Sequence, residues 1–237
     1  MRLPKSISPN PLFITTIEIR FLSSLTKAEL LQKMVLAFSD EFTNLEQSKI
    51  PEELKQQEKK FKYAADYMLS NDDYILSFAT NSISFEHSSE YKYWETYSTF
   101  IKKSLEKIFK LGFIEKIERC GVRYGSILDG LTDPSIALID LPKLEINGLQ
   151  SEFGGFQSVF KTDTSNLFLQ ITPNAKISKQ HEERRGLYID IDSSYSKELE
   201  PNQEVFDIID KLHKDQKELF FGLLKEEFVV KNLNPQY

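Results

Sequence analysis

The chain has a single cysteine, Cys120, so it cannot form an intramolecular disulfide bond. Disulfide frameworks belong to oxidising compartments, and one thiol is too few for any cysteine-based zinc pattern. Glycine is also sparse, at nine residues, and no glycine-rich phosphate loop occurs. The glycine pair within 153–156 lacks the Lys-Ser/Thr of a P-loop and the spacing of a dinucleotide fingerprint. The sequence therefore argues against disulfide-stabilised, zinc-binding and P-loop proteins.

Long apolar runs are missing too, and none approaches the length of a membrane-spanning helix. The first eleven residues contain three prolines and lack the apolar core of a signal peptide. We therefore expect a cytoplasmic protein that does not associate with membranes.

Positive charge is not in excess, since 30 basic and 36 acidic residues leave a net charge of −6. That balance does not favour a general nucleic-acid-binding protein, although a local basic surface stays open. Basic residues near the aromatic residues Tyr91 and Tyr93 are Lys92, Lys102, Lys103 and Lys107. Such a surface contacts nucleic acid in some proteins and is simply solvated in most.

Aromatic residues are abundant, with 18 phenylalanines and 10 tyrosines in 237 residues. This favours strands and a bulky core, and the chain is long enough to bury one. A first strand is expected over 12–21, because apolar and polar residues alternate there. One face would carry Ile17, Ile19 and Phe21, and the other Glu18 and Arg20.

A helix is expected directly after this strand. Thr26 is placed to cap it, Glu29 completes a capping box, and an apolar pattern follows to Phe42. The polar stretch 44–60 predicts an exposed short helix or a mobile insert, opened by Pro51.

Alternation and turn signals place the remaining elements. Strands are expected at 61–69, 74–79, 83–85, 115–126, 153–160, 167–171 and 186–192, with turns at 70–73, 129–130 and 172–175 and a charged loop at 181–185. Helices are expected at 88–112 and over 201–224, with a short one beginning at 133–134.

This order of elements predicts an α+β protein of mostly antiparallel sheets packed by long helices. It also suggests an internal pseudo-repeat of β-α-β-β-β-α units, with halves at 1–111 and 112–237 forming one globular unit. Two echoes support the repeat. The segment 19–21 (Ile-Arg-Phe) matches 122–124 (Val-Arg-Tyr), and 76–81 matches 169–174.

Four short motifs spread over the chain resemble one known pattern. They are Glu-Ile-Arg at 18–20, Tyr-Trp at 93–94, Arg-x-x-x-Arg-Tyr at 119–124 and Leu-x-x-Asp-x-Asp at 187–192. Together they are similar to a sporadically distributed prokaryotic family of uncharacterised proteins of similar length. Its patchy distribution implies accessory genes, for example in defence or toxin-control loci. After Arg-Tyr this chain has Gly125 and Ser126, where the family pattern has an apolar residue and Asn.

The candidate ligand-binding residues are charged or aromatic side chains on predicted strands: Arg20, Arg119, Arg123, Tyr124, Asp190 and Asp192. Arginines can bind an anion or pair with strand carboxylates, and structural pairing is the more common outcome. Asp190 and Asp192 share one strand face at a spacing compatible with a divalent cation, although such a site needs a further acid or histidine.

No catalytic constellation is recognisable. Cys120 lies beside Arg119, which could lower its thiol pKa, but a nucleophile also needs a base. The three histidines, His87, His181 and His213, form no recognisable arrangement with it. We therefore expect a buried structural thiol, no catalytic residues, no metal and no cofactor.

Three functions remain, and the first is preferred. The chain is expected to be a non-catalytic interaction or regulatory protein that binds a protein partner, as an accessory subunit of a prokaryotic defence or toxin-control system. The alternative is a nucleotide- or anion-sensing module with an arginine-lined cleft of Arg20, Arg119 and Arg123. The third is a metal-dependent nuclease or phosphodiesterase built on Asp190 and Asp192.

Overall fold

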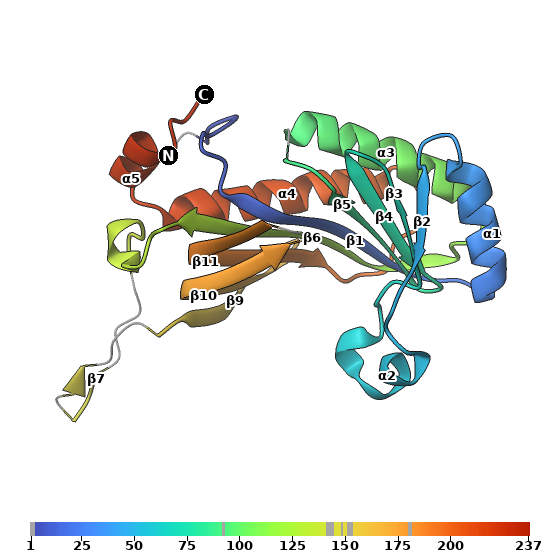
Figure 1. Cartoon of the computed structure of the whole chain (residues 1–237), viewed down its shortest axis with the longest axis horizontal. Helices are drawn as coiled ribbons and strands as arrows, with labels where there is room; N and C mark the ends of the chain where they lie inside the picture. The colour runs from blue at the N-terminus through green and yellow to red at the C-terminus, as the bar shows by residue number, and fades with distance from the viewer. Residues whose placement is uncertain (1–2, 92, 141–144, 148, 151–153, 180–181) are drawn as a thin grey trace. The chain divides into compact units, whose positions relative to one another are not determined.

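The computed structural model describes residues 3–91, 93–140, 145–147, 149–150, 154–179 and 182–237 (Figure 1). The strands are β1 (Leu12–Leu22), β2 (Asn44–Gln47), β3 (Tyr67–Ser70), β4 (Tyr74–Ala79), β5 (Ser82–His87), β6 (Lys116–Asp129), β7 (Glu145–Ile146), β8 (Leu149–Gln150), β9 (Phe156–Lys161), β10 (Asn166–Lys179) and β11 (Glu182–Tyr195). The helices are α1 (Lys27–Phe38), α2 (Glu52–Gln57), α3 (Trp94–Lys110), α4 (Glu204–Leu223) and α5 (Glu226–Asn232), with 3-10 turns η1 (Lys59–Phe61) and η2 (Pro134–Ile136).

One nine-stranded sheet has the order β2-β3-β4-β5-β1-β6-β11-β10-β9, and β7 and β8 form a separate hairpin. The pairs β1–β5, β2–β3, β3–β4, β4–β5 and β9–β10 are all antiparallel. The predicted α+β class is therefore confirmed.

The chain divides into two compact units. Unit 1 consists of residues 1–14, 123–193 and 212–237, and unit 2 of residues 15–122 and 194–211. These units are defined by proximity in the fold. The predicted halves, 1–111 and 112–237, are segments of the sequence and stay a prediction.

The core of unit 2 follows the alternation predicted for β1. Ile17, Ile19 and Phe21 are fully buried, as expected for one face of this strand. The capping box at α1 is present: Thr26 accepts from the Glu29 backbone N–H, and Glu29 accepts from the Thr26 N–H. These two bonds satisfy N–H groups that the first helical turn would leave unpaired, which fixes where α1 begins.

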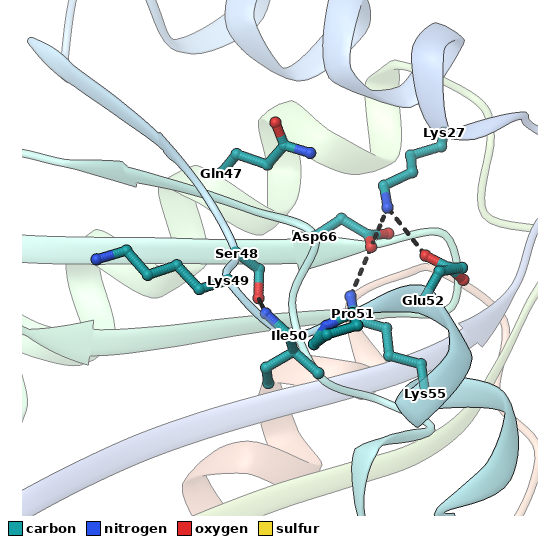
Figure 2. A pocket seen from close by; sticks show the side chains of 9 residues that line it. All are labelled: Lys27, Gln47, Ser48, Lys49, Ile50, Pro51, Glu52, Lys55 and Asp66. Carbon is teal, nitrogen blue, oxygen red and sulfur yellow. Dashed lines mark hydrogen bonds and ion pairs between the residues drawn. The ribbon is translucent and has the colours of Figure 1, made fainter.

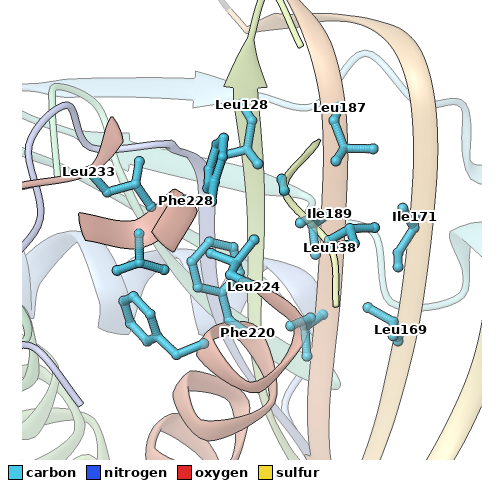
Figure 3. Close-up of a cluster of buried hydrophobic side chains, with 14 of the residues drawn as sticks. Leu128, Leu138, Leu169, Ile171, Leu187, Ile189, Phe220, Leu224, Phe228 and Leu233 are labelled. Atoms are coloured by element: carbon cyan, nitrogen blue, oxygen red, sulfur yellow. The ribbon is translucent and has the colours of Figure 1, made fainter. Parts of the chain in front are cut away.

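The core of unit 1 lies where α4, α5 and η2 meet β10 and β11 (Figure 3). Leu187, Ile189 and Ile191 project to this side because they lie two apart along β11. Phe220 and Leu224 approach from the C-terminal part of α4 and the residue just beyond it. The predicted short helix is present as η2, where the Asp133 side chain accepts from the Ser135 N–H at 2.9 Å.

The strand predicted over 61–69 is wrong in its first part, because η1 ends at Phe61 and β3 begins only at Tyr67. The Lys55 ammonium group donates to the carbonyls of Ala64 and Ala65, at 3.0 and 2.8 Å. The Lys55 side chain thus binds carbonyl groups that, in a strand, would accept hydrogen bonds from a neighbouring strand. The polar insert does contain the expected exposed helix, α2, but also the unpredicted edge strand β2.

The turn predicted at 172–175 is wrong as well, because β10 continues through it to Lys179. Asn174 adopts a left-handed backbone conformation with φ of 52°. Asparagine tolerates this region better than most residues, so the strand can bend locally and continue. The predicted loop at 181–185 is also a strand from Glu182 onward, while His181 and the strand start at 153 lie outside the described residues.

In the part of the chain that the structure describes, no helix combines the length and apolar composition that a membrane crossing requires.

Candidate functional site

The sequence-predicted ligand residues fall into two groups, one in each compact unit. Arg20 and Arg119 belong to unit 2. Four residues belong to unit 1: Arg123, Tyr124, Asp190 and Asp192. Each group is described within its own unit.

In unit 2, two arginines share one carboxylate oxygen. Arg20 Nε donates to Glu18 Oε2 at 2.7 Å, and Arg119 Nη1 donates to the same oxygen at 2.7 Å. Glu18 and Arg20 lie two apart on β1, so both project from the sheet face opposite the apolar core. The side chains are partly exposed, at 21% for Glu18, 29% for Arg20 and 14% for Arg119. We call these three residues the Glu18 cluster.

Tyr63 and Gly121 border the Glu18 cluster. The Arg20 guanidinium carbon lies 4.0 Å from the centroid of the Tyr63 ring, a cation–π contact that orients the arginine. A Cβ at Gly121 would lie only 2.8 Å from Arg119 Cζ, so the Arg119 guanidinium occupies the space above this glycine. Neither residue was predicted to belong to a site.

In unit 1, Arg123 pairs with Asp190. Arg123 Nε donates to Asp190 Oδ1 and Oδ2 at 3.0 and 3.2 Å, and Arg123 Nη2 donates to Oδ2 at 2.6 Å. The aspartate is buried while the arginine side chain is 50% exposed. These hydrogen bonds raise the pKa of the Arg123 guanidinium above its ordinary value. The pair has the geometry of a charge-assisted structural contact.

Tyr188 lies on the same face of β11 as Asp190, two residues away. Its ring fills the space above Gly125, where a Cβ would overlap the phenol oxygen and lie 2.9 Å from Cε2. Burial, with a contribution from Asp190, raises the pKa of Tyr188 to about 12. The phenol therefore stays protonated at neutral pH and can act only as a hydrogen-bonding group.

The aspartate pair does not gain a third metal ligand. Among the described residues, no group of three or more His, Cys, Asp or Glu side chains is placed to hold a metal ion. Both carboxylate oxygens of Asp190 also accept hydrogen bonds from Arg123. The described residues therefore give no support to a metal-dependent nuclease built on this pair.

Tyr124, adjacent to Arg123, projects to the other side of β6. Its hydroxyl lies 3.2 Å from His213 Nδ1 on α4, in contact with the helix. Burial, together with the charge of Lys217, lowers the pKa of His213 to about 3. The half-buried imidazole is therefore neutral at neutral pH, and Tyr124 does not join Arg123 in a site.

Cys120 is fully buried on β6. Burial raises the pKa of its thiol to about 12, against the opposing effect of Arg119. A thiol with this pKa forms almost no thiolate at neutral pH, so the structure favours the structural interpretation of Cys120.

A polar pocket of about 260 Å³ in unit 2 centres on Asp66 (Figure 2). Lys27 and Lys55 each place an ammonium nitrogen 2.6 Å from Asp66 Oδ1. Lys27 also contacts Glu52 at 3.2 Å. Burial lowers the pKa of Lys27, but hydrogen bonds to Asp66 and Glu52 outweigh it and raise that pKa. These contacts connect α2 to the start of α1. The residues that line the pocket therefore hold the insert in place.

The same unit exposes an apolar surface between α1 and the edge strand β2. It surrounds a shallow hollow of about 630 Å³. Leu36 on α1 is 71% exposed and Leu45 on β2 is 49% exposed. We define the α1–β2 surface by its apolar lining residues: Leu31, Val35, Leu36, Leu45 and Tyr67. The apolar helical pattern that ends at Phe42 predicted a core-facing helix and did not indicate this surface, since Leu36 lies outside that pattern.

Two of the four lysines considered for nucleic-acid contact have ion-pair partners. Lys102 binds Asp210 at 2.8 Å, and Lys107 binds Glu41 and the Ala37 carbonyl. Lys92 lies outside the described residues. These ion pairs are half-exposed and fix α3 to its neighbours within unit 2.

Two signals could have found the neighbours of the predicted arginines. Gly121 and Gly125 lie four apart on one strand, which places both on the same face and leaves room above each. Glu18 lies two residues before Arg20 on the same face, which makes it an obvious partner. Tyr63 carried no signal, since it was assigned to the first part of the predicted strand 61–69, which does not form.

No known family model matches this chain, and no protein of curated function is similar to it.

Proposed function

We propose that this chain is a non-catalytic interaction protein, and that a partner protein binds its α1–β2 surface. The observation that carries the proposal is the pairing of an exposed apolar helix face with an edge strand. Isolated exposed leucines are ordinary, but apolar residues gathered around a hollow are typical of binding surfaces.

The edge strand defines what kind of partner segment fits. β2 is the terminal strand of the sheet and pairs with β3 on one side only (Figure 1). An extended segment can add to such an edge through main-chain hydrogen bonds, while its apolar side chains enter the neighbouring hollow. We therefore propose an extended apolar segment as the occupant, lying along β2 and contacting Leu36 and Leu45.

The family resemblance supplies the proposed setting. Accessory genes of patchy distribution are expected to encode subunits that act on the other products of their locus. We propose that the partner belongs to a prokaryotic defence or toxin-control system and that this chain is its accessory or regulatory subunit.

An internal pseudo-repeat is part of the same proposal, and the strand order supports it. Outward from the middle of the sheet the order is β1, β5, β4, β3 in one direction and β6, β11, β10, β9 in the other. The first sequence echo pairs β1 with β6, and the second pairs β4 with β10. Both echoes thus fall on strands of equal rank. In the described part of the sheet, β2 has no strand of equal rank on the other side, so the edge strand of the α1–β2 surface belongs to one half alone.

The experiment is affinity capture from cells of the source organism with the tagged chain. Leu36→Glu and Leu45→Glu place charges on the proposed surface, and their high exposure should keep the loss of stability within about 0.5 kcal/mol. We expect each to remove a stoichiometric partner that the wild-type chain retains.

Val159→Glu is the matched control. Val159 is 54% exposed on β9, the strand at the other edge of the sheet. Loss of the partner in Val159→Glu but not in Leu36→Glu would overturn the proposal. So would a second copy of this chain as the occupant, seen as a dimer that Leu36→Glu dissociates in sedimentation experiments.

A further inference from the structure

We propose that the edge strand β9 of unit 1 pairs with β9 of a second copy of this chain. The two strands would run antiparallel about a two-fold axis at Ser158, and the surface would consist of the free edge of β9 and its apolar side chains. This proposal is independent of the α1–β2 surface, which belongs to unit 2.

The first argument is the edge itself. β9 pairs with β10 on one side, and the described part of the sheet has no strand beyond it (Figure 1). Proteins usually protect such an edge with charged residues or proline, because its main-chain groups can bind another strand. The sequence from Phe156 to Phe160 contains neither a charged residue nor a proline. β9 therefore lacks the usual protection against strand pairing.

The second argument is the direction of the main-chain groups. The Thr162 N–H donates to the Ser165 carbonyl at 2.9 Å, and the register between β9 and β10 continues from this turn without interruption. Antiparallel strands alternate between hydrogen-bonded and non-hydrogen-bonded pairs. The main-chain groups of Gln157 and Val159 therefore point away from β10, where a second strand can bind them.

The third argument is that β9 is complementary to itself. In a two-fold pair centred on Ser158, Phe160 of each copy lies opposite Phe156 of the other. These positions are non-hydrogen-bonded pairs, in which opposite side chains lie closest, and aromatic pairs there stabilise a sheet. Phe156 packs against the core of unit 1, whereas Phe160 is 42% exposed. The pairing would cover Phe160 and extend this core across the axis.

The other face of β9 fits the same register. Val159 lies opposite Phe168 of β10, and the two side chains are 54% and 38% exposed. Across the axis the two copies of Val159 are diagonal neighbours, which adds an apolar contact on this face. A pair centred on Val159 would instead place Phe160 opposite Ser158, and no phenylalanine pair would form. The side chains thus favour Ser158 as the centre.

The fourth argument is charge. Lys161 is the only charged residue of β9. In the proposed register it lies opposite Gly155 of the other copy, so the two lysines are about 20 Å apart along the strands. This is about twice the Debye length of 8–10 Å at physiological salt, so their repulsion is largely screened. Because both copies use the same edge, the assembly closes at two chains.

The test is sedimentation velocity of the chain over a range of concentrations. A single pair of short strands buries less surface than the roughly 1,200–2,000 Å² of a stable interface. We therefore expect monomers and dimers in exchange, with the dimer fraction rising with concentration. A monomer at every concentration up to the limit of solubility would overturn the proposal.

Variants locate the interface. Val159→Pro removes an N–H group that points away from β10, a position at which an edge strand tolerates proline. Phe160→Glu places a charge opposite Phe156 of the other copy. We expect each change to raise the dimer dissociation constant at least about tenfold. Circular dichroism and a cooperative thermal transition verify that each variant is folded.

Leu36→Glu is the control, since Leu36 is on α1 in unit 2. It should leave the dimer unchanged, which separates this proposal from the proposed function. Dissociation of the dimer by Leu36→Glu but not by Val159→Pro would place the contact on the α1–β2 surface and refute the pairing of β9.

Cross-linking tests the register. Ser158→Cys brings the two introduced thiols face to face at a separation suited to a disulfide, so mild oxidation should link two chains. Phe168→Cys, one strand further from the axis, is the matched control and should stay unlinked. Cys120 is fully buried, and the wild-type chain measures any linkage through it. Linkage through Val159→Cys or Phe168→Cys but not through Ser158→Cys would contradict the proposed pairing.

Discussion

The phenol of Tyr188 occupies the space that a side chain at Gly125 would need. Alanine at this position would place its Cβ 2.9 Å from Tyr188 Cε2, so the ring must move away from the strand. Because the ring is buried beside Asp190, moving it disturbs a packed environment. We predict that Gly125→Ala lowers the free energy of unfolding by about 1–3 kcal/mol, measured by urea denaturation.

Two other glycines allow a comparison with the predicted cost of Gly125→Ala. At Gly186 the obstacle is backbone, since a Cβ would lie 2.9 Å from the Leu128 carbonyl carbon and overlap its oxygen. Backbone cannot swing aside, so Gly186→Ala should cost more than Gly125→Ala. Gly154 has no atom near the added Cβ, and Gly154→Ala should be nearly neutral. An equal cost at all three positions would contradict this ranking.

The Arg123–Asp190 pair should matter more for stability than exposed ion pairs do. Arg123→Ala leaves a buried carboxylate without its bidentate donor, which we expect to cost about 2–3 kcal/mol in urea denaturation. Removing Lys214, which pairs with Glu218 on the exposed face of α4, should cost less than about 0.5 kcal/mol. Similar costs for Arg123→Ala and Lys214→Ala would show that Asp190 finds another partner or water.

Lys55 should hold the insert in place. Its ammonium nitrogen contacts Asp66 and two backbone carbonyls, and only 9% of its side chain is exposed. Lys55→Met removes the ammonium group that donates to these acceptors. The insert that contains α2 should therefore unfold locally more often. Hydrogen exchange over 48–66 should become faster while exchange in β10 and β11 stays the same. Lys60→Met, at an exposed position, is the control.

How far the sequence predicts the fold depends on where each signal comes from. Local signals succeeded: the capping box at Thr26, the alternation on β1 and the Asp133 cap of η2 are all present. Failures came where a distant residue decided the outcome. The strand expected at 61–69 is interrupted because Lys55 binds the carbonyls of Ala64 and Ala65, which no local pattern reveals.

The candidate site shows the same limit. The arginines could be chosen from the sequence because charges on strands are conspicuous. Their partners depend on which strands become neighbours in the sheet. The local sequence pattern does not reveal that strand order. Arg119 therefore joins Arg20 on Glu18, whereas Arg123, only four residues further along, pairs with Asp190 in the other unit.

Cys120 should be unreactive in the folded protein. Its burial and a pKa of about 12 leave almost no thiolate at neutral pH. A thiol reagent such as dithionitrobenzoate should modify the native chain very slowly and one thiol per chain after denaturation in urea. Rapid modification of the native chain would mean that β6 opens easily or that the thiol reaches solvent.

His213 should make stability depend on pH. Burial lowers its pKa from 6.5 to about 3 in the folded chain, so the unfolded chain binds a proton that the folded chain does not. The free energy of unfolding should therefore fall as pH decreases from about 6.5 towards 3, by at most about 1.4 kcal/mol per pH unit from this group.

Replacing the imidazole isolates that contribution. His213→Gln cannot be protonated, so its unfolding free energy should fall less steeply over the same pH range than that of the wild-type chain. Tyr124→Phe removes the hydroxyl that lies 3.2 Å from Nδ1 but keeps the imidazole buried, and it should retain the wild-type slope. Parallel curves for wild type and His213→Gln would mean that His213 binds its proton equally well in the folded and unfolded chains, and that burial does not lower its pKa.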